Sequence, residues 1–407
     1  MTTTRPPPAD RLEPAAHGPR RASFLELFFD LVFVFAFTRI SARAFEDLAL
    51  EPGGSAGWHP VTGGGKTLLL VLALWSIWQG TTLTIGRYDP YHLWLQTIVI
   101  TSLVAAMVMG VAIPKAYTSY GLMFAGAYVV AQLSRPLILF LALRRYHLRQ
   151  LKVRVLVVYA VVAVPWLVGA LLPVMPRVIL WTLALAIECV AARTGWPVPG
   201  LGRSRLDRWQ PAGEHLAERY QQFFLIAVGE TILFSGLAYS ARSFTPARTT
   251  AFGLALLTSI LLWRIYFHRA GRILAEAVAM ATQPAAIARS AADTHLVMVT
   301  GVVAAAIGYE LAIEHPLDHP EASWIALILG GPLLFLAGRA RFEYEVFGRV
   351  SPSRWIAMAA LVAPVWVLLH HPLLYSAGTA AVVLLAVAVA DARRAHHRPP
   401  EPAAPPF

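Results

Sequence analysis

The chain has 407 residues, of which 57% are apolar and only 14% are charged, whereas soluble globular domains contain about 25% charged residues. With a mean hydropathy of +0.57, this composition excludes a soluble globular protein. The net charge of +11 is divided among short segments between hydrophobic runs. A nucleic-acid-binding protein gathers its positive charge on one face, so we expect no nucleic-acid partner.

The first 22 residues are rich in Pro, Arg and Ala and contain no apolar stretch. They therefore do not form a secretory signal peptide. We expect residues 1–22 to be a disordered cytoplasmic tail and the first hydrophobic run to remain in the protein as a spanning helix.

Twelve hydrophobic runs follow, and each approaches the roughly 20 apolar residues that a helix needs to cross a bilayer. The first six lie at about 23–45, 67–86, 92–113, 120–143, 153–172 and 177–193. The second six lie at about 218–240, 249–268, 294–313, 323–338, 354–370 and 372–391. We therefore predict an all-α, polytopic transmembrane helical bundle of about twelve helices with the lipid bilayer as its surroundings.

The longest polar segment, residues 194–217, is predicted to be a cytoplasmic linker between a first six-helix unit at 23–193 and a second at 218–391. Residues 392–407 are predicted to form a second disordered cytoplasmic tail.

The positions of the basic residues predict the orientation, because cytoplasmic loops of membrane proteins carry an excess of Lys and Arg. With the N-terminal tail inside, the inside segments hold 24 of the 34 basic residues and the outside loops hold 5. We therefore expect a multi-pass protein of the bacterial plasma membrane with both termini in the cytoplasm.

Several residues recur between the two halves of the chain at offsets between 196 and 203. The matched pairs are Asp30 with Glu230, His92 with His295, Pro136 with Pro332, Trp166 with Trp366, and Glu188 with Asp391. This regular order indicates two parallel six-helix repeats.

Acidic side chains inside membrane segments are costly to bury, and they mark functional sites. Glu26 and Asp30 lie four residues apart in the first run and so share one face of a helix. Ser23 and Glu26 also have the spacing of a capping box, in which Glu26 would bind backbone amides. Asp30 lies about 10 Å into the helix, where it would either serve a polar pathway or pair with a structural arginine.

In the seventh run, Glu218 lies at the start and Glu230 lies near the middle. A carboxylate at mid-membrane depth must be protonated, paired, or exposed to a polar cavity. A protonatable Glu230 could couple to proton movement, and a static ion pair with Arg135 or Arg264 is the alternative.

His92 and His295 begin the third runs of the two halves, which suggests paired structural or titratable roles. A hydrogen bond from such a histidine to a backbone carbonyl is the simpler interpretation. Glu310, near the outer end of the ninth run, completes the set of candidate polar residues.

Other motifs do not support an enzyme. Residues 63–67 resemble part of a phosphate-binding loop, but the required first glycine is replaced by Pro60. The His and acidic residues in 315–321 alternate with prolines, which indicates an extended outer loop and not a metal site. The single cysteine, Cys189, excludes disulfides, and we expect it to be a small buried thiol. We predict no catalytic residue, metal or cofactor.

Four motifs of this sequence resemble the bacterial low-temperature-requirement A family. They are Glu-Leu-Phe-Phe-Asp-Leu-Val-Phe-Val at 26–34, Glu-Arg-Tyr at 218–220, Val-Gly-Glu-Thr-Ile-Leu at 228–233, and the His-Leu pair at 295–296. The resemblance covers roughly 20–391 and implies a polytopic membrane protein. It implies no particular biochemical activity.

The first motif is also similar to a signature of lysosomal and bacterial potassium channels built from six-helix repeats. Between Phe28 and Ala36, five of nine positions agree with Phe-Ser-Asp-Gly-Val-Phe-Ala-Ile-Ala. This likeness implies that the first helix of each repeat lines a pore.

From the buried acids and the repeat we expect a transporter or channel for a small solute or ion. A non-catalytic membrane sensor or scaffold for cold or envelope stress is the alternative, and a lipid-modifying membrane enzyme is a further one. The sequence leaves a homodimer open.

Overall fold

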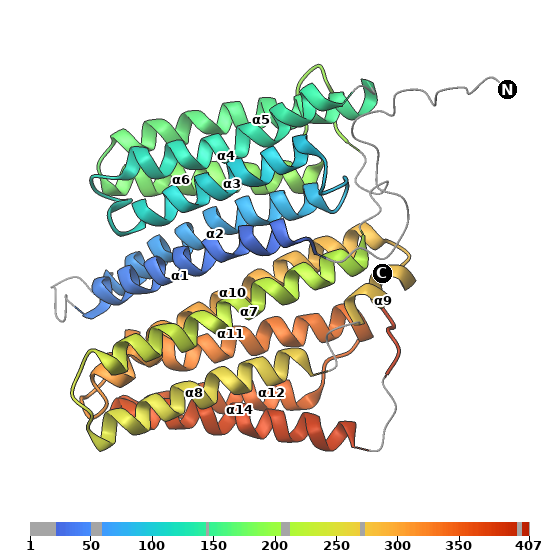
Figure 1. Ribbon diagram of the computed structural model, residues 1–407. Helices are drawn as coiled ribbons and strands as arrows, with labels where there is room; N and C mark the ends of the chain where they lie inside the picture. The colour runs from blue at the N-terminus through green and yellow to red at the C-terminus, as the bar shows by residue number, and fades with distance from the viewer. Residues whose placement is uncertain are drawn as a thin grey trace. The chain divides into compact units, whose positions relative to one another are not determined.

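A computed structural model of the protein describes residues 22–49, 59–143, 146–204, 212–268, 273–396 and 401–406. Within these residues the chain is mostly helical and contains no β-strand (Figure 1). The predicted all-α class is confirmed. Parts of three predicted segments lie outside the described residues. They are residues 1–21 of the N-terminal tail, residues 205–211 of the linker, and residues 397–400 and 407 of the C-terminal tail.

Apart from the short helix at Ile273–Met280, which lies between two predicted runs, the described helices follow the predicted hydrophobic runs. In the first half they are α1 (Phe24–Ala49), α2 (His59–Ile85), α3 (Leu93–Ala112), the short 3-10 helix η1 (Ile113–Lys115), α4 (Gly121–Ala142), α5 (Tyr146–Leu171) and α6 (Val174–Thr194). In the second half they are α7 (Gly213–Ser240), α8 (Pro246–Phe267), α9 (Ile273–Met280), α10 (Pro284–Glu314), α11 (Ala322–Phe347), α12 (Pro352–Val362), α13 (Val365–Leu368) and α14 (Leu373–Ala395).

Ten of the described helices are long and apolar enough to cross a membrane, namely α2 to α8, α10, α11 and α14. The predicted run at 354–370 forms two shorter helices, because the helix is interrupted at Pro364, between α12 and α13. α1 is long enough but carries six charged side chains, Glu26, Asp30, Arg39, Arg43, Glu46 and Asp47. The chain is therefore a multi-pass helical membrane protein, and α1 carries more charged side chains than any other long helix in the described part of the chain.

The described helices fall into two compact units. Unit 1 takes the described residues of 1–36 and 72–216, and unit 2 takes those of 37–71 and 217–407. The boundary passes through α1 and α2, so each unit contains part of both helices. The predicted division at 194–217 and the predicted repeat remain predictions.

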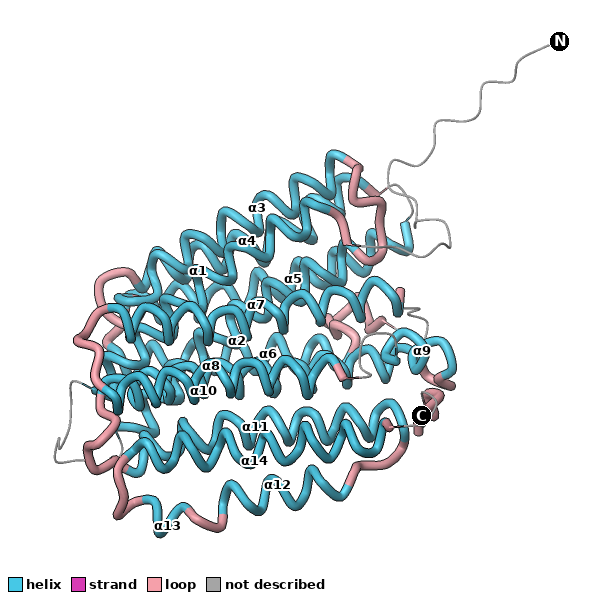
Figure 2. Tube along the Cα trace, turned by 60° about the horizontal axis from the view of Figure 1, so that its bottom comes forward, coloured by secondary structure: helices cyan, strands magenta, loops and turns pink. Residues whose placement is uncertain are grey.

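Within unit 1, α3, α4, α5 and α6 pack in chain order, each against the next (Figure 1). Within unit 2, α10 packs mainly against α11, while α8 packs against α10 and α14. α12 lies against both α11 and α14 (Figure 2). Four of these helices meet at one end of unit 2, where α8, α11 and α14 end and α12 begins.

Cys189 is exposed on α6, so the prediction of a buried thiol was wrong. The buried side of α6 consists of Arg177, Trp181, Ala184, Glu188 and Ala191. An apolar run in a membrane protein does not by itself distinguish the buried side of a helix from its exposed side, and Cys189 lies on the exposed side.

The contact between α10 and α11 depends on glycines that allow the two backbones to approach closely. A Cβ atom at Gly331 would lie 2.5 Å from the backbone nitrogen of Ala305 and 2.8 Å from the carbonyl oxygen of Gly301. Small residues at such positions are the usual means of packing helices in a bilayer, where helix association depends on van der Waals contact. A Cβ at the neighbouring Gly330 would meet nothing within 4 Å.

We expect Gly331→Ala to lower the stability of the protein by about 1–3 kcal/mol, because the added methyl group forces the α10 and α11 backbones apart. Gly330→Ala is the matched control, and we expect it to change the stability by less than about 0.5 kcal/mol. Thermal unfolding of both purified variants in detergent measures the difference. Equal unfolding temperatures would show that the close approach does not contribute.

Candidate functional site

The start of α1 is held by the predicted capping box. The backbone N–H of Ser23 donates to Glu26 Oε2 at 2.7 Å, and the N–H of Glu26 lies 3.4 Å from Ser23 Oγ. Within unit 1, His215 Nε2 also lies 2.7 Å from Glu26 Oε1. Both oxygens of Glu26 therefore have partners, and Glu26 holds the beginning of the helix in place.

Asp30 is buried one turn further along α1, with 2% of its surface exposed. The indole N–H of the fully buried Trp78, on α2, donates to Asp30 Oδ1 at 2.9 Å. Trp78 was not among the predicted polar residues, since nothing in its apolar surroundings distinguishes it from a packing tryptophan. The structure thus places Asp30 in the interior of unit 1 against a hydrogen-bond donor from a second helix.

A second polar group of unit 1 lies between α4 and α6. Glu188 Oε2 accepts hydrogen bonds from the Tyr128 hydroxyl at 2.5 Å and from Gln132 Nε2 at 3.4 Å, and Glu188 Oε1 accepts one from Trp166 Nε1 at 3.4 Å. Arg135 Nη2 donates to Gln132 Oε1 at 2.5 Å. The group is closed, because each side chain in it has at least one hydrogen-bond partner within the same unit.

Arg135 is a structural part of this group. Its guanidinium also reaches Tyr159 Oη at 3.3 Å, and a Cβ atom at Gly80 of α2 would overlap it. Gly80 therefore provides the space in which the Arg135 side chain lies.

Glu230 is a buried carboxylate of unit 2 with a single hydrogen bond among the described residues. It is fully buried, and the Thr38 hydroxyl donates to its Oε2 at 2.7 Å. Its other oxygen, Oε1, is buried and has no hydrogen-bond partner among the described residues. Arg264, the predicted alternative partner on α8, lies with its Nη1 2.6 Å from His268 Nδ1.

A second carboxylate, Glu310, lies close enough to Glu230 to be affected by its charge. Glu310 on α10 experiences the charges of Glu230, Glu314 and Glu46. Its Oε2 is also buried without a partner among the described residues. Glu314, by contrast, pairs with Arg242 at 3.1 Å. Glu230 and Glu310 are therefore two neighbouring carboxylates, and no ion pair in the described part of unit 2 neutralises either of them.

Buried hydroxyl groups line the same helices. Thr231 on α7 and Ser259 on α8 lie 2.6 Å apart, Oγ1 to Oγ. Ser41 on α1 and Ser235 on α7 are buried, and their hydroxyls have no hydrogen-bond partner among the described residues. α1, α7, α8 and α10 thus carry oxygen ligands of both the carboxylate and the hydroxyl type inside unit 2.

The two predicted histidines occupy different positions. His92 caps the N-terminus of α3, where its Nδ1 accepts from the backbone N–H of Trp94 at 3.3 Å. His295 is buried well inside α10, which begins at Pro284 and not near position 294 as predicted. Its Nδ1 lies 2.7 Å from the carbonyl oxygen of Ala291, in agreement with the predicted carbonyl hydrogen bond.

Glu218 is half-buried near the start of α7, as its position in the predicted run indicated. The residues discussed so far are therefore of two kinds. Glu26, Arg135, His92 and His295 hold helices in place, whereas Asp30 and Glu230 are buried acids inside long helices.

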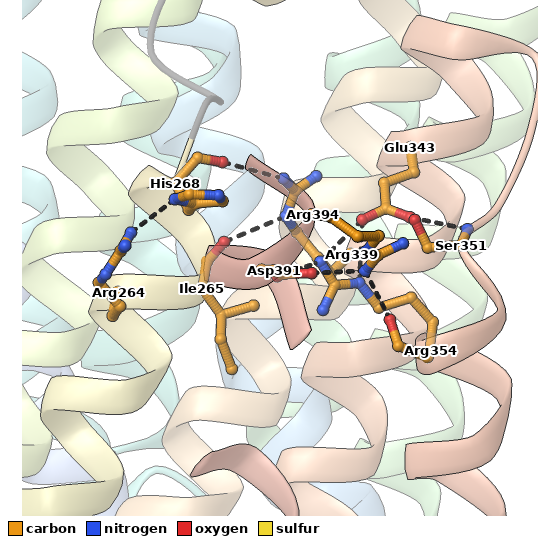
Figure 3. Close-up of polar contacts among 10 residues, drawn as sticks. Arg264, Ile265, His268, Arg339, Glu343, Ser351, Arg354, Asp391 and Arg394 are labelled. Atoms are coloured by element: carbon orange, nitrogen blue, oxygen red, sulfur yellow. Dashed lines mark hydrogen bonds and ion pairs between the residues drawn. The ribbon is translucent and has the colours of Figure 1, made fainter. Parts of the chain in front are cut away.

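One cluster of unit 2 was missed at the level of sequence. Arg354 Nη2 lies 2.8 Å from Glu343 Oε1 and 2.7 Å from Asp391 Oδ2, and Arg394 Nη2 lies 2.6 Å from Asp391 Oδ1. Figure 3 shows these side chains converging from α11, α12 and α14, with Arg339 beside them. The arginines were counted as loop charges, and the one available signal was the i, i+4 spacing of Arg339 and Glu343.

Comparison with known proteins identifies relatives over most of the chain. The family model described as bacterial low temperature requirement A protein (LtrA) matches residues 21–389. An uncharacterized protein of Rhizobium meliloti (strain 1021) is 31% identical over 373 residues, which are 91% of this chain and 88% of that protein. No solved structure matches the chain.

We expect Arg354→Ala to lower the free energy of unfolding by about 3 kcal/mol or more, because it leaves the buried carboxylates of Glu343 and Asp391 without their shared cation. Arg349→Ala removes the same charge from the loop between α11 and α12, where 71% of the Arg349 side chain is exposed, and should cost less than about 1 kcal/mol. The two changes are compared by thermal unfolding in detergent. A similar loss in both variants would mean that the buried pairs do not stabilise unit 2.

Proposed function

The chain belongs to the bacterial low temperature requirement A family, and we propose that it is a transporter or channel for a small cation or a proton. In this proposal Glu230 is the principal charged group of the pathway and Asp30 is the second. The observation that carries it is the state of Glu230, a fully buried carboxylate with one oxygen lacking any partner among the described residues.

An ionised carboxylate in an apolar interior is stable only when a cation or several hydrogen-bond donors compensate its charge. Glu230 receives one described hydrogen bond, from Thr38. Its electrostatic neighbour Glu310 has the same sign of charge. The missing positive charge must therefore come from a bound proton or from a bound cation, and these are the species that we propose to be transported.

The available ligands suit such a species. Proton sites and alkali-cation sites are built from oxygen atoms, and hard cations prefer carboxylate, carbonyl and hydroxyl oxygens. Among the described residues, no three His, Cys, Asp or Glu side chains form a group that could hold a metal ion. This arrangement favours a proton or a monovalent cation over a divalent or transition metal.

The character of α1 supports the same function. α1 carries Asp30 in its first half and Thr38, the partner of Glu230, eight residues later. A helix that faced lipid over its length would not keep six charged side chains, because charges within membrane segments face the protein interior or water. We therefore propose that α1 lines the pathway.

Transport is tested with the full chain in proteoliposomes. We expect Glu230→Gln to reduce the flux of the transported cation at least about tenfold, because the amide can neither bind a proton nor neutralise a cation. H⁺, Na⁺ and K⁺ gradients are applied in turn, and flux is read with a pH-sensitive dye or the corresponding ion probe. Asp30→Asn is measured in the same assay.

The matched control is Glu214→Gln, which removes a carboxylate from the exposed first turn of the same helix. We expect its flux to stay within about twofold of wild type, since an exposed charge outside the pathway is screened by solvent. Equal flux in wild type, Glu230→Gln and Asp30→Asn for all three cations would refute the proposal.

The hydrogen bond from Thr38 provides a finer test. Thr38→Val preserves the shape of the side chain but removes the donor, and we expect the half-saturating cation concentration to rise about tenfold, as for the loss of a hydrogen bond to a charged group. Thr38→Ser keeps the hydroxyl and should behave like wild type. If both variants have the same half-saturating concentration, Thr38 does not hold the carboxylate in its binding geometry.

A further inference from the structure

Arg339 is a buried cation whose hydrogen bonds are incomplete. It lies in α11 with 5% of its surface exposed. Its Nε and Nη2 reach the carbonyl oxygens of Ile265 and His268 at 3.4 and 3.5 Å, at the end of α8 (Figure 3). These are long distances for N–H···O hydrogen bonds, which are usually 2.7–3.2 Å. The third nitrogen, Nη1, is buried and has no partner among the described residues.

Arg177 in unit 1 shows what a completed arginine cap looks like in this protein. Its three nitrogens donate to the carbonyl oxygens of five residues at 2.8–3.3 Å, namely Ala116, Thr118, Gly169, Ala170 and Leu172. The carbonyls of Gly169 and Ala170 lie in the last turn of α5 and that of Leu172 directly follows it, at the helix end where the dipole favours a cation. Arg339 has two long contacts of this kind, so the capping of α8 accounts for only part of its hydrogen-bonding capacity.

Arg354 leaves a second donor free in the same cluster. Its Nε and Nη2 bind Glu343 and Asp391, but its Nη1 is buried and unpartnered among the described residues. Arg339 and Arg354 are electrostatic neighbours of each other and of both carboxylates. Counting Arg394, which also binds Asp391, three arginines face two carboxylates, so the cluster keeps one positive charge.

We propose that Arg339 and Arg354 form a binding site for a phosphate group at the end of unit 2 where α8, α11, α12 and α14 meet. A buried cation with unused donors is stabilised by an anion that accepts several hydrogen bonds. Phosphate suits the planar guanidinium fork, which binds its oxygens in pairs. The phosphate would complete the donors of both arginines and neutralise the remaining charge.

The surroundings place this site at the depth of lipid head groups. Arg339 lies eight residues before the end of α11, about 12 Å along the helix. Arg354 lies in the first turn of α12, next to the exposed Trp355, and exposed tryptophans mark the membrane–water interface. Arg394, which also binds Asp391, is 40% exposed, so the cluster reaches the surface of unit 2. The phosphate of a phospholipid and a free phosphate ion both have the required chemistry.

The test uses the full chain, delipidated in a maltoside detergent, with its unfolding temperature followed by tryptophan fluorescence. The probes are inorganic phosphate, dihexanoyl phosphatidylglycerol, and dihexanoyl glycerol as the phosphate-free lipid, all at constant ionic strength set with sodium chloride. We expect the phosphate-containing probes to raise the unfolding temperature of wild type and dihexanoyl glycerol to leave it unchanged. Arg339→Gln should weaken the apparent affinity about tenfold to a hundredfold, the effect of losing a charge-assisted hydrogen bond.

Arg349→Gln is the matched control, because it removes the same charge from an exposed position near the same end of α11. It should keep the full response to phosphate. Should Arg339→Gln fail to fold, Arg339→Lys takes its place, since it keeps the charge but lacks the fork. Native mass spectrometry of the wild-type protein with each probe provides a measurement that needs no variant.

The outcomes separate the sources of the phosphate. A response to either phosphate-containing probe supports the site. If only phosphatidylglycerol raises the unfolding temperature, the ligand is a lipid, and if only inorganic phosphate does, the ligand is the free ion. If both probes raise it, the site accepts either ligand. The absence of a response and of an adduct in wild type overturns the proposal. An equal response in wild type and in the Arg339 variant also overturns it, and Arg339 is then only a cap for α8.

Discussion

A charge buried among membrane helices must be compensated inside the protein, because the hydrocarbon core offers no water to solvate it. The structure of this chain depends on how that requirement is met at each buried ionisable residue. In unit 1, two residues show it being met: Glu188 accepts from three side chains, and Arg177 donates to five carbonyl oxygens. Such groups fix helices relative to their neighbours within the unit and leave nothing for a ligand to supply.

Much of the fold can be predicted from the sequence, because the cost of burying charge in the hydrocarbon core keeps the membrane-spanning segments apolar. Each spanning helix needs an uninterrupted apolar run, so hydrophobicity alone located the helices. The capping box of Ser23 and Glu26 was also readable, since it joins residues three apart. Boundaries were less accurate where polar residues continue a helix beyond its apolar part. α10 begins at Pro284, about ten residues before the predicted run, and this difference moves His295 from a helix start to a helix interior.

The partners of the buried acids could not be predicted, because they come from distant parts of the chain. Trp78 and Thr38 bind Asp30 and Glu230 across sequence separations of 48 and 192 residues. The cluster around Arg354 has the same origin: its members come from three helices, and the sequence offered no reason to separate them from ordinary loop arginines. Sequence identifies which charges must be compensated, and only the packing of helices identifies what compensates them.

The degree of compensation therefore divides the buried charges into those whose contacts hold the fold and those for which we propose a ligand. Arg135 and Glu26 belong to the first kind, because the described contacts use their donor and acceptor atoms locally. Glu230 and Arg339 belong to the second, since each keeps a buried polar atom without a partner among the described residues. Their charges are opposite, so a cation suits one and an anion the other. An uncompensated charge in an apolar interior destabilises the helices that carry it, and the ligands that we propose for Glu230 and Arg339 would remove that cost.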